Sequence, residues 1–130
     1  MKNLTLSFVA ILFCFLSYSQ TVFTNQSKET CWWNTYKQKF EQCSGTSFDN
    51  SVFIVNENED MVVHRTSTMT STYYVTKTEV ETNFITYEVI SDVGNSYTLM
   101  FDVAKRLVKI MGSDSQGNVF ITMYSVKSVF

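Results

Sequence analysis

The residues best suited to chemistry lie between positions 31 and 43, where two cysteines bracket a pair of tryptophans in CWWNTYKQKFEQC. A pair of thiols can exchange electrons, hold a metal ion or form a disulfide. The spacing is not the Cys-x-x-Cys of a redox motif, and two thiols without nearby histidines make only half of a zinc site. We therefore predict a structural disulfide between Cys31 and Cys43, with no metal and no cofactor.

The bracket also predicts its own local structure. On a helix, Cys31 and Cys43 would lie about 18 Å apart, because each residue adds 1.5 Å, and no disulfide spans that distance. A hairpin centred on Lys37 instead places the two cysteines opposite each other and points Trp32 and Trp33 to opposite sides. We expect one tryptophan in the core and the other at its rim. The alternative is an aromatic platform for a ligand or partner.

The remaining reactive groups do not form a catalytic set. His64 is the only histidine, and no serine or cysteine nucleophile is linked to it by a motif. Glu79 and Glu81 share one strand face, but Lys77 beside them indicates a solvated charged face. The acidic stretch 56–60 lacks the spacing and glycine of an EF-hand loop, so a charged turn is expected there. A small hydrolase is the hypothesis with least support, and we predict no enzymatic activity.

The start of the chain, MKNLTLSFVAILFCFLSYSQ, has the pattern of a secretory signal peptide. Lys2 supplies a positive charge, a short apolar run follows, and Ser17 and Ser19 are the small residues expected before a cleavage site. The apolar run is shorter than the roughly 20 residues that a membrane-spanning helix needs. We predict that residues 1–19 are removed before Gln20 and that the protein is secreted or periplasmic.

Residues 20–130 are expected to form a single all-β domain. Losing Lys2 lowers the Lys and Arg count from 10 to 9 against 12 Asp and Glu, a net charge of −3. No basic stripe is present, so nucleic acid is not expected as a partner. Cleavage also removes Cys14 and leaves two cysteines for an oxidising compartment. Proline is absent and Thr, Val, Tyr, Phe and Ile abound, a composition typical of strands.

Turn signals in the second half of this domain predict a strand register. A three-residue loop over 93–95, a two-residue turn over 105–106 and a four-residue loop over 114–117 pair apolar residues with apolar residues throughout. The predicted pairs include Tyr87 with Phe101, Val89 with Leu99, Val103 with Val108, and Ile110 with Ile121. One face then collects Ile85, Tyr87, Val89, Leu99, Phe101, Val103, Val108, Ile110, Val119, Ile121 and Met123.

Strands upstream complete the expected architecture. SVFIVNENEDMVVHRT gives two strands around an acidic turn, and STYYVTKTEV gives another. We predict an antiparallel β-meander of about 7–9 strands that forms a small lipocalin-like barrel or a folded-over sheet. The opposite face of the meander is not cleanly polar, since Met111, Phe120 and Tyr124 lie on it and Met111 faces Phe120 in this register. These residues are expected to be covered by the first strands or to remain as a partner surface.

The stretches NENEDMVVH, STYYV, SDVGNSYTLMFD and YSVKSVF make the chain similar to small secreted β-meander proteins, lipocalin-like in shape, that are found in bacterial genomes. The resemblance covers most of residues 20–130, but it consists of turns and core positions. It implies secretion and fold, and it transfers no activity and no site residue.

These observations predict a secreted non-enzymatic module that binds a small apolar ligand or a protein partner, without stable membrane insertion. The alternatives are a small outer-membrane β-barrel and a purely structural protein of the cell envelope. The first stays open because alternation alone does not say whether the apolar face points into the barrel or toward lipid. The candidate ligand or partner surface consists of Trp32, Trp33, Met111, Phe120 and Tyr124.

Overall fold

The computed structural model describes residues 20–130, and the predicted signal peptide at residues 1–19 lies outside the described residues. Ten strands follow one another along this part of the chain: β1 (Thr21–Asn34), β2 (Lys39–Glu41), β3 (Ser47–Phe48), β4 (Val52–Val55), β5 (Met61–Arg65), β6 (Thr70–Val80), β7 (Phe84–Ser91), β8 (Ser96–Asp102), β9 (Leu107–Ser113) and β10 (Val119–Val129). None of the described residues forms a helix of the length and apolarity that a membrane span requires.

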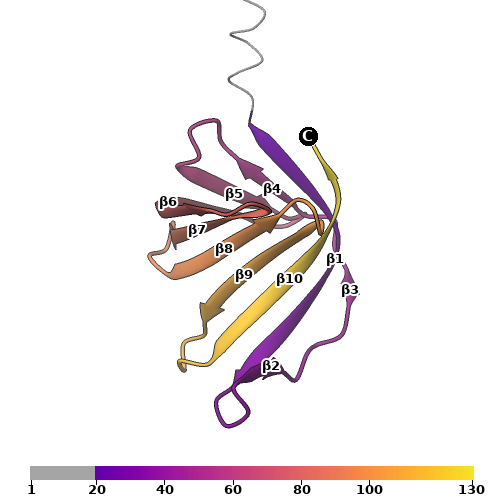
Figure 1. Cartoon of the computed structure of the whole chain (residues 1–130), viewed down its shortest axis with the longest axis vertical. Coiled ribbons are helices and arrows are strands. Elements are labelled where there is room, and N and C mark those ends of the chain that lie inside the picture. The colour runs from indigo at the N-terminus through magenta and orange to yellow at the C-terminus, as the bar shows by residue number, and fades with distance from the viewer. Residues whose placement is uncertain (1–19) are drawn as a thin grey trace, which may run out of the picture.

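Eight of the strands close into an antiparallel barrel (Figure 1). From β4 to β10 each strand pairs with the next, and β1 closes the barrel by pairing with β4 on one edge and β10 on the other. The short strands β2 and β3 pair with β1 beyond the reach of β4. The prediction of an all-β, lipocalin-like meander is confirmed. Closure removes the free sheet edges that would otherwise invite aggregation.

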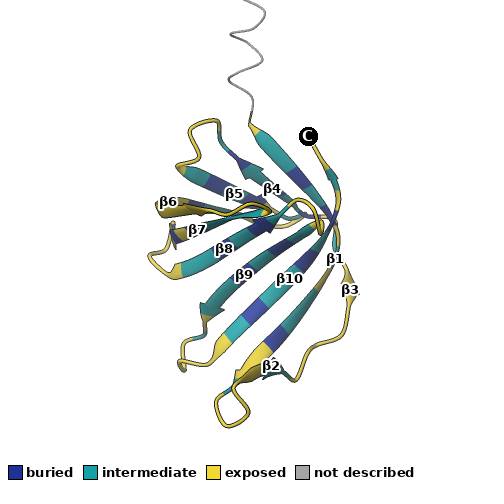
Figure 2. Ribbon diagram, viewed as in Figure 1, coloured by how far each residue is buried: buried dark blue, intermediate teal, exposed yellow. Residues whose placement is uncertain are grey.

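The core fills the middle of the barrel. Alternate residues of each strand point inward, and Phe53, Val62, Leu99 and Val108 are fully buried there. The Phe53 ring packs edge-on against Phe101, with 5.9 Å between ring centroids. Each such side chain contributes about 1.5–3 kcal/mol by leaving water. Figure 2 shows buried positions as dark blue bands along the strands and exposed residues mainly at the turns.

The β7–β8 register differs from the predicted one by two residues. Tyr87 lies opposite Leu99, not Phe101. The cause is the turn, in which the backbone N–H of Ser91 donates to the Asn95 carbonyl at 2.8 Å and leaves residues 92–94 as the loop. A shift of two keeps every side chain on its face, so the predicted inward residues of these strands stayed inward.

The β8–β9 turn is longer than predicted. Asp102 pairs with Leu107, so residues 103–106 form a four-residue turn and Phe101 lies opposite Val108. Val103 was predicted to pair with Val108 on the apolar face, but it lies in this turn and is 55% exposed.

The β9–β10 hairpin is shifted by one residue, which exchanges the two faces of β10. Asp114 fixes a different loop from the predicted one, because its Oδ1 atom accepts the backbone N–H groups of Gln116 and Asn118. Its own N–H donates to the Asn118 carbonyl at 2.9 Å and leaves residues 115–117 as the loop. Val108 therefore pairs with Tyr124, and Tyr124 is buried in the core instead of lying on an outer surface. Val119, Ile121 and Met123 were predicted to point inward, and for the same reason they lie on the other face of β10. Ile121 is nevertheless buried, at 8% exposure, opposite Cys31. The face that includes Phe120 and Thr122 points inward in their place.

Candidate functional site

A pocket of about 450 Å³ opens at the end of the barrel where β1 begins, which we call the pocket end. It lies above the packed core, between the start of β1 and three turns that join β4 to β5, β6 to β7 and β8 to β9. Its lining is mainly apolar. The lining residues are Thr21, Phe23, Val55, Glu59, Val80, Glu81, Thr82, Asn83, Phe84, Ile85, Tyr87, Phe101 and Val103.

The turns that frame the pocket are set by local hydrogen bonds. In the acidic β4–β5 turn, the Asn56 side-chain oxygen accepts the backbone N–H groups of Asp60 and Met61, at 3.0 and 3.2 Å. Glu59 in this turn adopts a φ of 55°. In the β6–β7 turn, the Glu81 N–H donates to the Phe84 carbonyl at 2.9 Å. The pocket rim is thus formed by tight, internally bonded turns.

One hydrogen bond crosses the wall of the pocket. The Tyr87 hydroxyl donates to Glu59 Oε1 at 2.7 Å. Burial of Tyr87, followed by its contact with Glu59, raises the pKa of the phenol well above its usual value. The hydroxyl therefore keeps its proton and remains a donor at neutral pH. Glu59 accepts that hydrogen bond while its side chain stays at the exposed rim.

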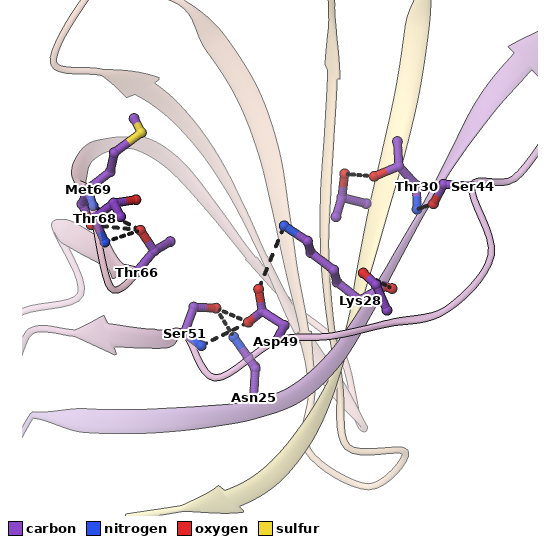
Figure 3. Close-up of polar contacts among 11 residues, drawn as sticks. Asn25, Lys28, Thr30, Ser44, Asp49, Ser51, Thr66, Thr68 and Met69 are labelled. Atoms are coloured by element: carbon purple, nitrogen blue, oxygen red, sulfur yellow. Dashed lines mark hydrogen bonds and ion pairs between the residues drawn. The ribbon is translucent and has the colours of Figure 1, made fainter.

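A second group of polar side chains gathers further along β1, where bulges on either side of Asn25 interrupt the pairing with β10 (Figure 3). Asn25 Nδ2 donates to Ser51 Oγ at 2.9 Å, and Ser51 donates through its N–H, at 2.8 Å, and its hydroxyl to Asp49. Lys28 Nζ lies 3.8 Å from Asp49 Oδ2. Asn25 Oδ1 is buried without a hydrogen-bond partner among the described residues.

His64 lies beside this group, inside the barrel. Its ring stacks on Phe53 with 4.2 Å between centroids and an interplanar angle of 9°, and it meets Tyr124 edge-on at 5.3 Å. Its Nε2 atom is buried and has no hydrogen-bond partner in the described part of the chain. Burial lowers the pKa of His64 to about 4, with Asp49 opposing and Lys28 adding to that effect. The ring is therefore neutral at pH 7 and packed as a core residue.

The disulfide between Cys31 and Cys43 is confirmed. The hairpin that carries it is not centred on Lys37, because β1 pairs with β2 one residue out of the predicted register, with Trp33 opposite Phe40. Asn34 explains the difference, since its side-chain oxygen accepts the backbone N–H groups of Tyr36 and Lys37 at 3.0 Å each and closes a four-residue turn.

The disulfide determines whether the neighbouring cluster of Glu29, Cys31 and Cys43 can bind a metal ion. A carboxylate oxygen of Glu29 and the sulfurs of Cys31 and Cys43 lie within 4.8 Å of one another, the spacing of a small metal site. Both sulfurs are bonded to each other, however, and a disulfide offers no thiolate. The bracket acts here as a covalent link between β1 and the segment after β2.

The two tryptophans are equally exposed. One of them was expected in the core, and neither lies there. Trp32 is 36% exposed and packs on Phe120, whereas Trp33 is 37% exposed and packs on Phe40. Their positions alternate along β1, so they lie on opposite sides of the sheet.

The five residues predicted as one ligand or partner surface are therefore not brought together. Trp32 and Phe120 share the inner side of the β1–β10 pair, Trp33 lies on the outer side, and Met111 lies opposite Ile121 on the outer side. Tyr124 is buried. Trp32 and Trp33 both line a small hollow of about 230 Å³ at the β1–β2 hairpin, and Met111 lines another hollow of about 440 Å³ between β7, β8 and β9. The apolar pocket at the pocket end takes its walls from other residues.

Fold and pocket together define the class: a small, eight-stranded, lipocalin-like antiparallel barrel with an apolar pocket at one end. Comparisons with protein-family models, curated proteins and solved structures gave no match for this chain.

The pocket was not predicted from the sequence. Its apolar walls have the sequence pattern of ordinary strand positions. The pocket forms because three turns lie side by side at one end of the barrel. The signal that could have found it was the acidic turn at 56–60 followed at a distance by the polar, proline-free turn at 81–83, two connections that a meander brings to the same end.

Proposed function

We propose that residues 20–130 form a secreted, non-enzymatic binding module that takes a small apolar ligand in the pocket at the pocket end. The observation that carries this proposal is the pocket itself, because its volume of about 450 Å³ falls in the range of known ligand sites and its walls are mainly apolar. The Cys31–Cys43 disulfide supports an oxidising compartment outside the cytoplasm.

The distribution of side chains favours this module over the outer-membrane barrel left open by the sequence. A barrel in lipid carries its apolar band on the outside and polar residues within. Here the largest buried apolar side chains, Phe53 and Leu99 among them, point into the barrel. The outer part of β6 carries the exposed ion pair between Lys77 and Glu79, with 2.9 Å between its atoms. Such a surface is suited to water.

The proposal is tested by titrating purified residues 20–130 with N-phenyl-1-naphthylamine, a neutral dye that fluoresces in apolar surroundings. We expect saturable binding of one dye per chain. Val103→Trp, at the exposed rim of the pocket, should weaken dye binding at least tenfold by filling the opening. Val93→Trp is the matched control, because Val93 is also exposed but lies in the β7–β8 turn, outside the pocket lining.

Two results would count against the proposal. One is fluorescence that rises without saturation, as for non-specific adsorption. The other is equal binding by both tryptophan variants, which would place the dye elsewhere. Circular dichroism of each variant shows whether it has folded.

A further inference from the structure

The acidic side chains at the pocket opening indicate the charge of the ligand's head group. Resting on the proposed function, we propose that the ligand is a cationic amphiphile, with an apolar tail in the pocket and an ammonium group at the rim, and that the pocket discriminates against fatty-acid carboxylates.

The apolar and charged parts of the lining are separated in depth. Phe23, Val55 and Phe101 are buried and form the inner walls. Glu59 and Glu81 are exposed and belong to the turns at the opening. A ligand that enters with its tail first therefore leaves its head group beside two carboxylates. This is the arrangement that an amphiphile requires.

The charged side chains that line this pocket have one sign. Among the described residues that line the pocket, Glu59 and Glu81 are the charged side chains, and this lining contains no lysine, arginine or histidine. Glu57 and Asp60 add two more acidic groups in the same β4–β5 turn, whereas Arg106 in the β8–β9 turn donates to the Lys127 carbonyl at 2.8 Å and does not line the pocket. Lys105 lines an adjoining hollow together with Asp102 and Glu81, where acidic groups outnumber it.

The hydrogen bonding around Glu59 also favours a donor ligand. The Tyr87 hydroxyl donates one hydrogen bond to Oε1 and fixes the side chain against the pocket wall. A carboxylate has about four acceptor sites, so Glu59 can accept further hydrogen bonds from an ammonium group. A carboxylate ligand would bring only acceptors to this rim and would meet like charge.

The expected preference is moderate, because exposed ion pairs are screened by water. For an amine and a carboxylate of equal chain length, attraction in one case and repulsion in the other should together give about a tenfold ratio of dissociation constants. The ratio should shrink in high salt, since the Debye length falls from about 10 Å at 0.1 M to about 3 Å at 1 M.

The experiment is displacement of bound N-phenyl-1-naphthylamine by dodecylamine, dodecanol and dodecanoate, the alcohol below its solubility limit and the other two below their micelle concentrations. The unmodified protein should prefer the amine to the alcohol and the alcohol to the carboxylate. Glu59→Gln and Glu81→Gln should each reduce the amine-to-carboxylate ratio two- to fivefold, and an amide at position 59 can still accept from Tyr87. Glu88→Gln, on the exposed outside of β7, makes the same change in net charge and should leave the ratio unchanged.

The outcomes separate the two proposals. If the dye binds but all three competitors displace it equally, or dodecanoate displaces it best, the charge preference is overturned while the binding module stands. The charge preference is also overturned if Glu88→Gln lowers the ratio as much as the two rim variants, since the effect would then come from net charge alone. If no dye binds to the unmodified protein, both proposals fall.

Discussion

Burying an unpartnered histidine in the core should make stability depend on pH, and His64 offers a direct test. The ring is 9% exposed, stacked on Phe53, and its Nε2 atom has no hydrogen-bond partner in the described part of the chain. A proton added there would place a charge between aromatic rings. Of the charged groups that act on it, Asp49 favours that charge and Lys28 disfavours it, and both act less strongly than burial.

The size of the effect follows from the pKa of His64, which is 6.5 in the unfolded chain and about 4 in the folded protein. As pH falls below 6.5, the unfolded chain binds a proton that the folded protein does not accept, so the free energy of unfolding decreases. At pH 5 the loss is roughly 2 kcal/mol, and it levels off at about 3 kcal/mol near pH 4, where the folded protein is also protonated. The loss is about 0.4 kcal/mol at pH 6.5 and vanishes as the pH rises above that value.

The measurement is urea unfolding of the unmodified protein and of His64→Phe at several pH values from 4 to 8. Phenylalanine keeps a flat ring against Phe53 and cannot titrate. Carboxylates titrate in both proteins, so the difference between their curves isolates His64. We expect the two free energies to run parallel above pH 6.5 and to diverge below it, the unmodified protein losing more. Parallel curves down to pH 4 would refute the reasoning, and His64→Leu provides a second comparison if the phenylalanine variant does not fold.

Two further predictions concern the disulfide and a close backbone contact. Replacing both Cys31 and Cys43 by serine should lower the free energy of unfolding by about 3 kcal/mol in denaturant titrations, because the closed loop restricts the unfolded chain; an unchanged midpoint would contradict this. Gly112→Ala should cost about 1–3 kcal/mol, since a Cβ atom there would lie 2.5 Å from the Tyr97 ring. The cost should largely vanish in a Tyr97→Ala background, and an equal cost in both backgrounds would exclude that contact as the cause.

The fold class could be predicted from the sequence because strand periodicity survives small errors of register. The β7–β8 and β8–β9 pairings were wrong by two residues, yet Tyr87, Leu99 and Phe101 kept their inward orientation. Apolar matching could not choose between the registers, because each residue had an apolar neighbour in either one. The β7–β8 register is set by the turn, in which the Ser91 N–H donates to the Asn95 carbonyl.

An error of one residue has a different consequence. Asp114 binds two backbone N–H groups in the β9–β10 loop and thereby shifts the register by one residue from the predicted one. This shift places Tyr124 in the core instead of on an outer surface. Asn34 likewise shifts the register of the β1–β2 hairpin by one residue, because its side-chain oxygen accepts two backbone N–H groups of the turn. In both turns an Asn or Asp side chain accepts backbone N–H groups of the loop, and such residues are visible in the sequence. The predicted registers instead followed the placement of Cys31 opposite Cys43 in one hairpin and the matching of apolar residues in the other.

The pocket and the cysteine bracket lie at opposite ends of strand β1. This strand is 14 residues long, and its first residues, Thr21 and Phe23, line the pocket while Cys31 lies beyond the barrel's middle. The cysteine bracket, the strongest chemical signal in the chain, thus marks the opposite end of the strand from the pocket. Between them, the bulges around Asn25 break the regular pairing. The disulfide can therefore stabilise the fold without shaping the pocket, and its removal should weaken stability more than dye binding.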